Sequence, residues 1–486
     1  MKRFIPPLVA AACGLLFALA AATALLEAPT VCEGGNAVEG MKIAHGIEIY
    51  RDPAQGPSAF PYTPFYPLVL AMIESATNAD PVRLGRAVSL AAIVLALALV
   101  RGQAQREGRP RAVTLALILW ALAALWSIDM IALEAYPNAL ASAIALAAVL
   151  SWQRGLDSGA FRLAALGAAL AVLATFTKQT LGWVAVYYLV ATLRARGLLW
   201  SGRLVLVSLA ATGVFLLFAL PFVGTHMIFY TVTSPGAQAR SLTLLRENII
   251  YGAPLLGSAL VLSLLAAWKA GWRIALRDAR FHVALLAIVT AVLFSSKIGS
   301  RGYALISVPF LVLPWLLREG TELDALRERW IERIPVLPLV CLLALHPAVQ
   351  RARSSLDSQK AHARWAKDMQ GVVASVTSAR RVYYSDAYDN WTLAHELTPE
   401  VFEVALEAWS ARPTAVNEFF DAFLARKYDV VVLSCAPEYE PNYSGVFDRK
   451  LVQAHYDCIA IDRRSKPRSI FEKGFPPESR IYARRP

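Results

Sequence analysis

Long apolar segments separated by short basic loops run through most of this chain, and they constrain its fold more than any other feature. Of its 486 residues, 57% are hydrophobic and 17% are charged, and the mean hydropathy is +0.46. A soluble protein of this length would leave too much apolar surface in water. The pattern therefore predicts a polytopic α-helical membrane protein.

The net charge of +12 does not predict nucleic-acid binding, because Lys and Arg fall in the short loops between the apolar runs. Basic residues in such loops set the topology, since they stay in the cytoplasm. Lys2 and Arg3 precede the first apolar run, Pro6 to Leu26, so we expect a cytoplasmic N-terminus and a retained first helix. By the same rule the loop from Arg101 to Arg111 is cytoplasmic.

The stretch from Leu163 to Leu193 is too long for one ordinary span and is interrupted by Thr177-Lys178-Gln179-Thr180. Basic residues flank both of its ends, so a single helix would put one flank on the wrong side of the membrane. We therefore expect a hairpin with Lys178 at its outer tip. About eleven spans and an outer C-terminus follow from the charge rule. The remaining expected spans are about Val82 to Val100, Ala112 to Ile128, Asn138 to Trp152, Leu204 to Phe222, Ala253 to Trp268, Val283 to Phe294, Tyr303 to Leu317 and Ile334 to His346.

The composition becomes that of an ordinary soluble domain after Pro347. We therefore expect a multi-span membrane domain over 1–347, with an outer loop over 27–80, and a small periplasmic α/β domain over 348–486. In that domain we expect strands at Arg381 to Tyr384, Asp429 to Leu433 and Cys458 to Ile461, and a helix at Val416 to Lys427.

Two cysteines, Cys435 and Cys458, lie in or beside these strands. An oxidising periplasm would permit a disulfide between them, whereas two buried thiols are the alternative. The sequence leaves both open. No Cys/His spacing predicts a zinc site, and dependence on a divalent metal is left open.

Three phrases in the first outer loop place charged and aromatic groups at the membrane surface. A carboxylate there, such as Glu33, is costly unless it functions. The phrases are Cys32-Glu33-Gly34-Gly35-Asn36, Gly46-Ile47-Glu48-Ile49-Tyr50-Arg51-Asp52 and Phe60-Pro61-Tyr62-Thr63-Pro64-Phe65-Tyr66-Pro67.

Together these phrases resemble the first periplasmic loop of the GT-C superfamily of membrane glycosyltransferases, which use polyprenyl-phosphate-linked sugars. The likeness is greatest to the branch that holds the protein O-mannosyltransferases and the aminoarabinose transferase of lipid A. Thr177-Lys178-Gln179 resembles the loop lysine of that branch, and Ser300-Arg301-Gly302-Tyr303 with Pro309 resembles its late Arg-x-Tyr…Pro element.

The chain departs from the family pattern at two places. Cys32 stands where family members often have a second acid, and Ala135-Tyr136-Pro137-Asn138 resembles an Arg-Pro-Asp phrase without its Arg and Asp. Asp129 and Glu134, in the same outer loop as that phrase, are the candidates for a second catalytic acid.

The resemblance implies an inverting transfer of sugar from the lipid carrier to a glycan, lipid or protein acceptor. The transfer would take place at the periplasmic face of a bacterial inner membrane. Glu33 would accept the proton of the acceptor hydroxyl. Lys178, Lys297, Arg301 and Tyr303 would bind the donor phosphate. Substrate would also contact Tyr50, Tyr62, Tyr66 and Asn138. The donor lipid carries the activated sugar, so no further cofactor is implied.

Each assignment has a plainer alternative. Glu33 is otherwise a solvated loop residue or a helix cap, Lys178 a headgroup anchor, and the tyrosines part of an interfacial aromatic belt. A transporter or flippase of lipid-linked sugars is the rival function, although transporters tend to place charges at the midplane of repeated halves. A scaffold that binds through the external domain is a third possibility. The sugar, the acceptor and the carrier length are not identified by the sequence.

Overall fold

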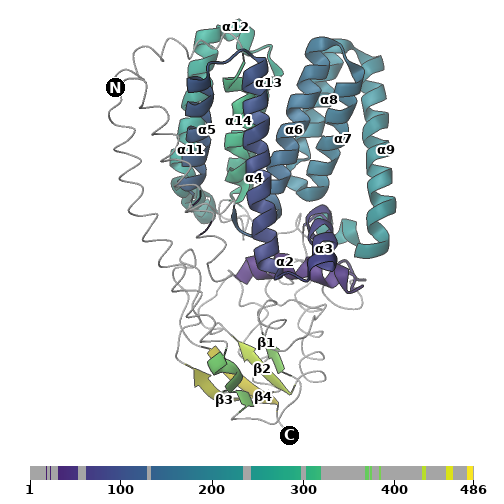
Figure 1. Ribbon diagram of the computed structural model, residues 1–486, viewed down its shortest axis with the longest axis vertical. Helices are drawn as coiled ribbons and strands as arrows, with labels where there is room; N and C mark the ends of the chain where they lie inside the picture. The colour runs from purple at the N-terminus through teal and green to yellow at the C-terminus, as the bar shows by residue number, and fades with distance from the viewer. Residues whose placement is uncertain are drawn as a thin grey trace. The chain divides into compact units, whose positions relative to one another are not determined.

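In the computed structural model, the described residues form helices between 31 and 316 and four strands between 382 and 484 (Figure 1). The residues that it describes are 18, 22, 31–52, 62–128, 133–233, 242–296, 303–318, 367–371, 373–374, 382–384, 429–433, 456–462 and 479–484. Contacts between Cα atoms divide the chain into two compact units. The first comprises 1–22, 86–218 and 239–350, and the second 23–85, 219–238 and 351–486.

The first unit is a bundle of apolar helices that run side by side along the vertical of Figure 1. Its helices are α4 (Pro81–Arg106), α5 (Arg111–Trp126), α6 (Pro137–Ser158), α7 (Phe161–Thr177), α8 (Trp183–Arg196), α9 (Leu198–Val223), α11 (Leu242–Ala270), α12 (Trp272–Ala275), α13 (Ala279–Phe294) and α14 (Ser307–Leu316), with the 3₁₀ turns η3 (Gln179–Leu181) and η5 (Tyr303–Ile306). The first residues of α4 and the last of α9 fall in the second unit.

Helices α6 and α7 form a tight antiparallel hairpin. Gly159 closes α6 in the left-handed conformation at φ 71°, which suits a residue without a Cβ. Two further glycines set the closeness of the two helices, because a Cβ on Gly155 would collide with Ala164 and one on Gly167 with Trp152. Small residues allow such backbone contact between helices in a membrane. The hairpin brings the start of α6 and the end of α7 to the same end of the bundle.

The apolar stretch that follows α6 is broken where the sequence predicts it. Helix α7 ends at Thr177, Lys178 is extended at φ −152° and ψ 115°, and one 3₁₀ turn leads into α8. Both helices are short, and the basic residues Arg194 and Arg196 lie in the last turn of α8. The predicted hairpin with Lys178 at its turn agrees with this backbone.

Four helices of the described residues are long and apolar enough to cross a membrane by length and composition, namely 81–106, 137–158, 198–223 and 245–270. Shorter apolar helices lie at 65–77, 113–125, 161–177, 279–294 and 304–316. Each described helix of the bundle overlaps a predicted span or half of the predicted hairpin, except for the short α12. The span expected at Ile334 to His346 lies outside the described residues, as does nearly all of the first span.

In the second unit, residues 27–80 contain two helices. The sequence alone predicts only an outer loop for this segment. The helices are α2 (Val31–Ala44) and α3 (Phe65–Thr77), and they pack against each other. A Cβ on Gly40 would collide with Leu70, so this glycine permits their close approach. The adjacent Gly34 and Gly35 disfavour a helix by propensity, which is why tertiary packing rather than local sequence decides α2.

Four strands in the second unit form one sheet in the order β1-β2-β4-β3. Strands β1 (Val382–Tyr384) and β2 (Val430–Leu433) pair in parallel, whereas β4 (Ser479–Arg484) pairs antiparallel with β2 and with β3 (Tyr456–Asp462). The three predicted strands are present, and β4 was missed. The predicted helix at Val416 to Lys427 and residue Cys435 lie outside the described residues, so the disulfide stays untested.

Candidate active site

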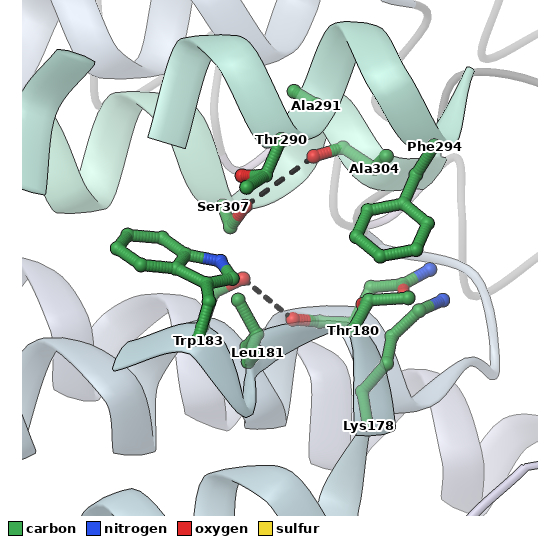
Figure 2. A pocket seen from close by; sticks show the side chains of 11 residues that line it. Lys178, Thr180, Leu181, Trp183, Thr290, Ala291, Phe294, Ala304 and Ser307 are labelled. Carbon is green, nitrogen blue, oxygen red and sulfur yellow. Dashed lines mark hydrogen bonds between the residues drawn. The ribbon is translucent and has the colours of Figure 1, made fainter. Parts of the chain in front are cut away.

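A pocket at the end of the bundle where α6 begins collects polar side chains from five segments (Figure 2). Its cavity volume is about 20 Å³, which is room for about one water molecule. The residues that line it are Asn138, Ser142, Lys178, Thr180, Leu181, Trp183, Thr290, Ala291, Phe294, Ala304 and Ser307. We call this the lysine pocket.

Lys178 brings a cation into the lysine pocket. Its side chain is 8% exposed, and in Figure 2 it extends toward the wall that carries Phe294. Burial lowers the pKa of Lys178, which lies between two helices, to about 7, because the charged amine loses its hydration. An anionic oxygen beside the amine would favour the charged form and would itself be stabilised.

Asn138 brings a buried amide without hydrogen-bond partners among the described residues into the lysine pocket. It is the second residue of α6 and is 3% exposed. Neither its Oδ1 nor its Nδ2 has a hydrogen-bond partner among the described residues. Burying an amide without partners costs free energy. A ligand that accepts from Nδ2 would satisfy the nitrogen, and Oδ1 would need a separate donor. Ser142, one turn later, instead donates to the Asn138 carbonyl at 2.7 Å.

The opposite wall of the lysine pocket comes from α13, η5 and α14 (Figure 2). Thr290 and Ser307 donate to backbone carbonyls of their own segments, Leu286 at 2.7 Å and Ala304 at 3.3 Å. These residues, together with Trp183, were missed by the sequence analysis. A lone Thr or Ser in an apolar helix carries no local signal of a site, since its hydroxyl usually bonds back to the helix.

A buried ion pair lies in α2, and it too was missed. Lys42 Nζ donates to Glu39 Oε1 at 2.7 Å, with side chains 1% and 2% exposed. Burial raises the pKa of Glu39 and Lys42 opposes the rise. Glu39 Oε2 has no hydrogen-bond partner among the described residues. The i, i+3 spacing of Glu and Lys was the signal that could have found this pair.

The predicted tyrosines of the first loop have different surroundings. Tyr50 is fully buried; its hydroxyl donates to the Tyr62 carbonyl and its ring stacks on Tyr230 at 6.0 Å. Burial raises the pKa of Tyr50, and the charge of Glu39 adds to the rise. Tyr66 in α3 is also fully buried, and Tyr62 is partly exposed. Tyr50 therefore links Tyr62 and Tyr230 through a hydrogen bond and a ring contact. Contact of Tyr50, Tyr62 and Tyr66 with substrate stays a prediction.

Glu134 lies in a short segment before α6 and is 8% exposed. Its carbonyl accepts from Ser89 Oγ of α4 at 2.7 Å, which anchors the segment. It does not line the lysine pocket, as far as the described lining shows. Its role as an acid remains a prediction.

The other predicted site residues are described in part or not at all. Glu33 lies in α2 and Tyr303 begins η5, but the structure describes only their backbone. Asp129, Lys297 and Arg301 lie outside the described residues. Of the predicted phosphate and substrate groups, the structure therefore brings Lys178 and Asn138 together in the lysine pocket and joins Tyr50 to Tyr62. Over the described ranges, no group of three or more His, Cys, Asp or Glu is placed to hold a metal ion.

No protein-family model matches this chain, and no curated protein matches it. Among solved structures, the crystal structure of ArnT from Cupriavidus metallidurans bound to undecaprenyl phosphate superposes with a TM-score of 0.59 at 14% identity, covering 99% of this chain and 98% of ArnT. The chain has the fold of ArnT. The apo structure of the same enzyme gives a TM-score of 0.56 at 14% identity, covering 97% of this chain and 96% of ArnT.

The likeness to ArnT extends over nearly the whole chain. The resemblance to GT-C enzymes, which the sequence carries in scattered phrases, is thereby confirmed as a fold. At 14% identity, most side chains of ArnT have no counterpart here, so the residues of this chain must be argued individually.

Proposed function

We propose that this chain is a membrane-embedded glycosyltransferase that takes a sugar from a polyprenyl-phosphate carrier. The observation that carries the proposal is the ArnT fold over 99% of the chain, shared with a structure that holds undecaprenyl phosphate. Lys178 and Asn138 support it, because the amine and the amide nitrogen can donate to the oxygens of a lipid-linked phosphate. The phosphate would lie against the lysine pocket rather than inside it, since the cavity holds about one water molecule.

The reaction needs one proton acceptor and one site for a leaving phosphate. The acceptor hydroxyl oxygen bonds to the anomeric carbon while the bond from that carbon to the phosphate oxygen breaks. The hydroxyl proton passes to a carboxylate, and the phosphate leaves with the bonding electrons and gains negative charge. A direct displacement of this kind inverts the anomeric carbon.

We assign the proton acceptor to Glu33, in α2, and the phosphate to Lys178 and Asn138. Lys297, Arg301 and Tyr303 are further proposed phosphate ligands, from the segment that leads into η5. Asp129 and Glu134 are the alternatives for the acid. The acceptor, which is a glycan, lipid or protein, would approach from the periplasm, and the enzyme would lie in a bacterial inner membrane with its N-terminus in the cytoplasm.

The proposal is tested with purified protein in liposomes, supplied with a polyprenyl-phosphate sugar and an extract of envelope glycans and lipids on one face. We expect a new glycosidic product, detected by mass spectrometry, together with release of polyprenyl phosphate. A transporter or flippase would instead move the donor across the bilayer and form no glycosidic bond. Translocation without product would reject the enzyme.

Substitution of Glu33 by Gln keeps the shape of the side chain but removes the proton acceptor. We expect turnover to fall by about 10²–10⁴-fold, the usual contribution of a general base. Glu48→Gln is the matched control, because Glu48 is an exposed carboxylate of the same loop. If Glu33→Gln kept wild-type turnover while Asp129→Asn or Glu134→Gln abolished it, the base would belong to the second outer loop.

A further inference from the structure

A second cavity lies at the other end of α6, about 24 Å from the lysine pocket along the helix axis at the usual rise per residue. Its volume is about 260 Å³, and it is formed by the ends of α4, α6 and α14 and the starts of α7 and α13. The residues that line it are Gln103, Glu107, Leu150, Gln153, Arg154, Asp157, Ser158, Leu163, Arg280 and Pro314. We call it the arginine cavity.

Arg280 forms one wall of the arginine cavity, and carboxylates balance its charge. Its Nη1 donates to Glu107 Oε1 at 3.2 Å, while Nε and Nη2 donate to the two carboxylate oxygens of Asp278 at 3.1 Å each. Asp278 also pairs with Arg318. This part of the cavity is a closed network that joins α4 to α13 and the end of α14.

Arg154 forms another wall, and its charge is not balanced in this way. Its Nε and Nη2 both donate to the neutral amide oxygen of Gln103, at 3.3 and 2.8 Å. Within the described part of the chain, the partly buried Arg154 forms no ion pair. It experiences repulsion from Arg106 and attraction from Glu107, whose Oε1 is already bonded to Gln103 and Arg280.

The fourth charge that lines the cavity, Asp157, is exposed and accepts from Gln153 at 2.8 Å. Asp157 is therefore solvated, and its hydrogen-bond partner is Gln153 rather than Arg154. The wall also has apolar parts, Leu150, Leu163 and Pro314, and Leu163 is 37% exposed. The cavity thus combines an arginine that lacks a counter-ion with an apolar rim at the basic face of the bundle.

We propose that the arginine cavity binds a phosphate group through Arg154, supplied by the headgroup of an anionic lipid or by a soluble phosphate ester. Basic pockets between membrane helices on the cytoplasmic side bind such headgroups, and a guanidinium can hold two phosphate oxygens at once. The volume of about 260 Å³ lies just under the ~300 Å³ at which pockets for whole small molecules begin. It therefore suits a headgroup better than a nucleotide. This site is distinct from the lysine pocket and does not depend on the proposed transfer reaction.

The test uses the full chain in nanodiscs of equal parts phosphatidylglycerol and phosphatidylcholine, extracted gently for native mass spectrometry. We expect the wild type to retain phosphatidylglycerol in preference to phosphatidylcholine. Arg154→Ala should weaken that retention about tenfold or more, since a charge-assisted pair is lost. Arg162→Ala is the control, because Arg162 is an exposed arginine at the start of α7 that does not line the cavity.

A second arm separates the two sources of phosphate. Glycerol phosphate is added to protein in pure phosphatidylcholine nanodiscs, and thermal unfolding is followed. A stabilisation that disappears in Arg154→Ala supports the site with a soluble ligand, whereas retention of phosphatidylglycerol alone supports it with a lipid. Arg154→Lys keeps the charge but loses the two-point contact of the guanidinium, and it serves as the test if the alanine variant fails to fold. It should bind phosphate severalfold more weakly than the wild type. Equal retention by wild type and both variants, with no effect of glycerol phosphate, overturns the proposal.

Discussion

Helix α6 has a polar cavity near each end, and the two cavities differ in the groups that line them. At the arginine cavity, the carboxylates of Glu107 and Asp278 hold Arg280 between α4, α13 and α14. At the lysine pocket, the described lining contains no carboxylate, and both amide atoms of Asn138 lack partners among the described residues. Buried charges that are paired stabilise packing, whereas buried polar groups left without partners indicate a place for a ligand.

The largest effect is expected where the charges are paired. Arg280→Ala leaves Glu107 and Asp278 close together without their shared cation, so we expect the free energy of unfolding to fall by about 3 kcal/mol, since removing one member of a buried pair strands the other. Thermal unfolding in detergent measures this, with the exposed Arg277→Ala as control. Unchanged stability would mean that the network does not hold the helices together.

The lysine pocket should give the opposite result, with loss of activity and a smaller loss of stability. Lys178→Ala removes a cation that stabilises the leaving phosphate, and we expect kcat/KM for the donor to fall by about 10²-fold. The melting temperature should fall less than in Arg280→Ala, because no carboxylate of the described lining is left without its cation. Lys269→Ala, at an exposed lysine on α11, is the control. Normal turnover in Lys178→Ala would remove Lys178 from the phosphate site.

A smaller effect tests the amide. Asn138→Asp puts a carboxylate into the pocket that holds Lys178, where it would repel the donor phosphate and compete for the amine. We expect KM for the donor to rise about tenfold, since like charges in contact oppose binding. Binding of labelled polyprenyl phosphate measures the change directly. If affinity is unaffected, Asn138 faces the sugar or has a structural role.

The smallest effect is a dependence on pH. The charged amine of Lys178 is the form that binds phosphate, and burial lowers its pKa to about 7. Raising the pH through 7 therefore removes the charge from the unliganded enzyme, and kcat/KM for the donor should fall severalfold between about pH 6 and pH 8. Lys178→Arg should abolish this fall, because Arg stays charged. A profile that is the same in both proteins would assign the titration to another group.

The sequence predicted the presence of every described bundle helix except α12, because the others lie in apolar runs whose breaks are marked by charged or polar residues. The break after Thr177 was also predictable, since a polar quartet divides an apolar stretch with basic flanks at both ends. Strand β4 was not predicted. Its sequence, Ser479 to Arg484, alternates little and contains two arginines, and it is a strand because it pairs with β2 and β3.

The candidate site was predictable only in part. Lys178 could be identified as an interruption of an apolar run, and Asn138 by its place at the start of a helix in a phrase that resembles the family. The pair Glu39–Lys42 was overlooked because Gly34 and Gly35 disfavour a helix in this segment. The i, i+3 spacing of the pair brings the two side chains together only on a helix. Thr290 and Ser307 carry no local signal at all.

By itself the sequence determined that the chain enters a membrane, that most helices of the bundle exist, and that a polar quartet interrupts one apolar stretch, because these follow from hydropathy and charge along the chain. Only the tertiary structure decided that Asn138 and Lys178 share one pocket with residues of α13 and α14, and that Arg280 has carboxylate partners while Arg154 has an amide. Such pairings depend on how glycines such as Gly155 and Gly167 let α6 and α7 approach, and close packing is a property of helices together that no local stretch of sequence contains.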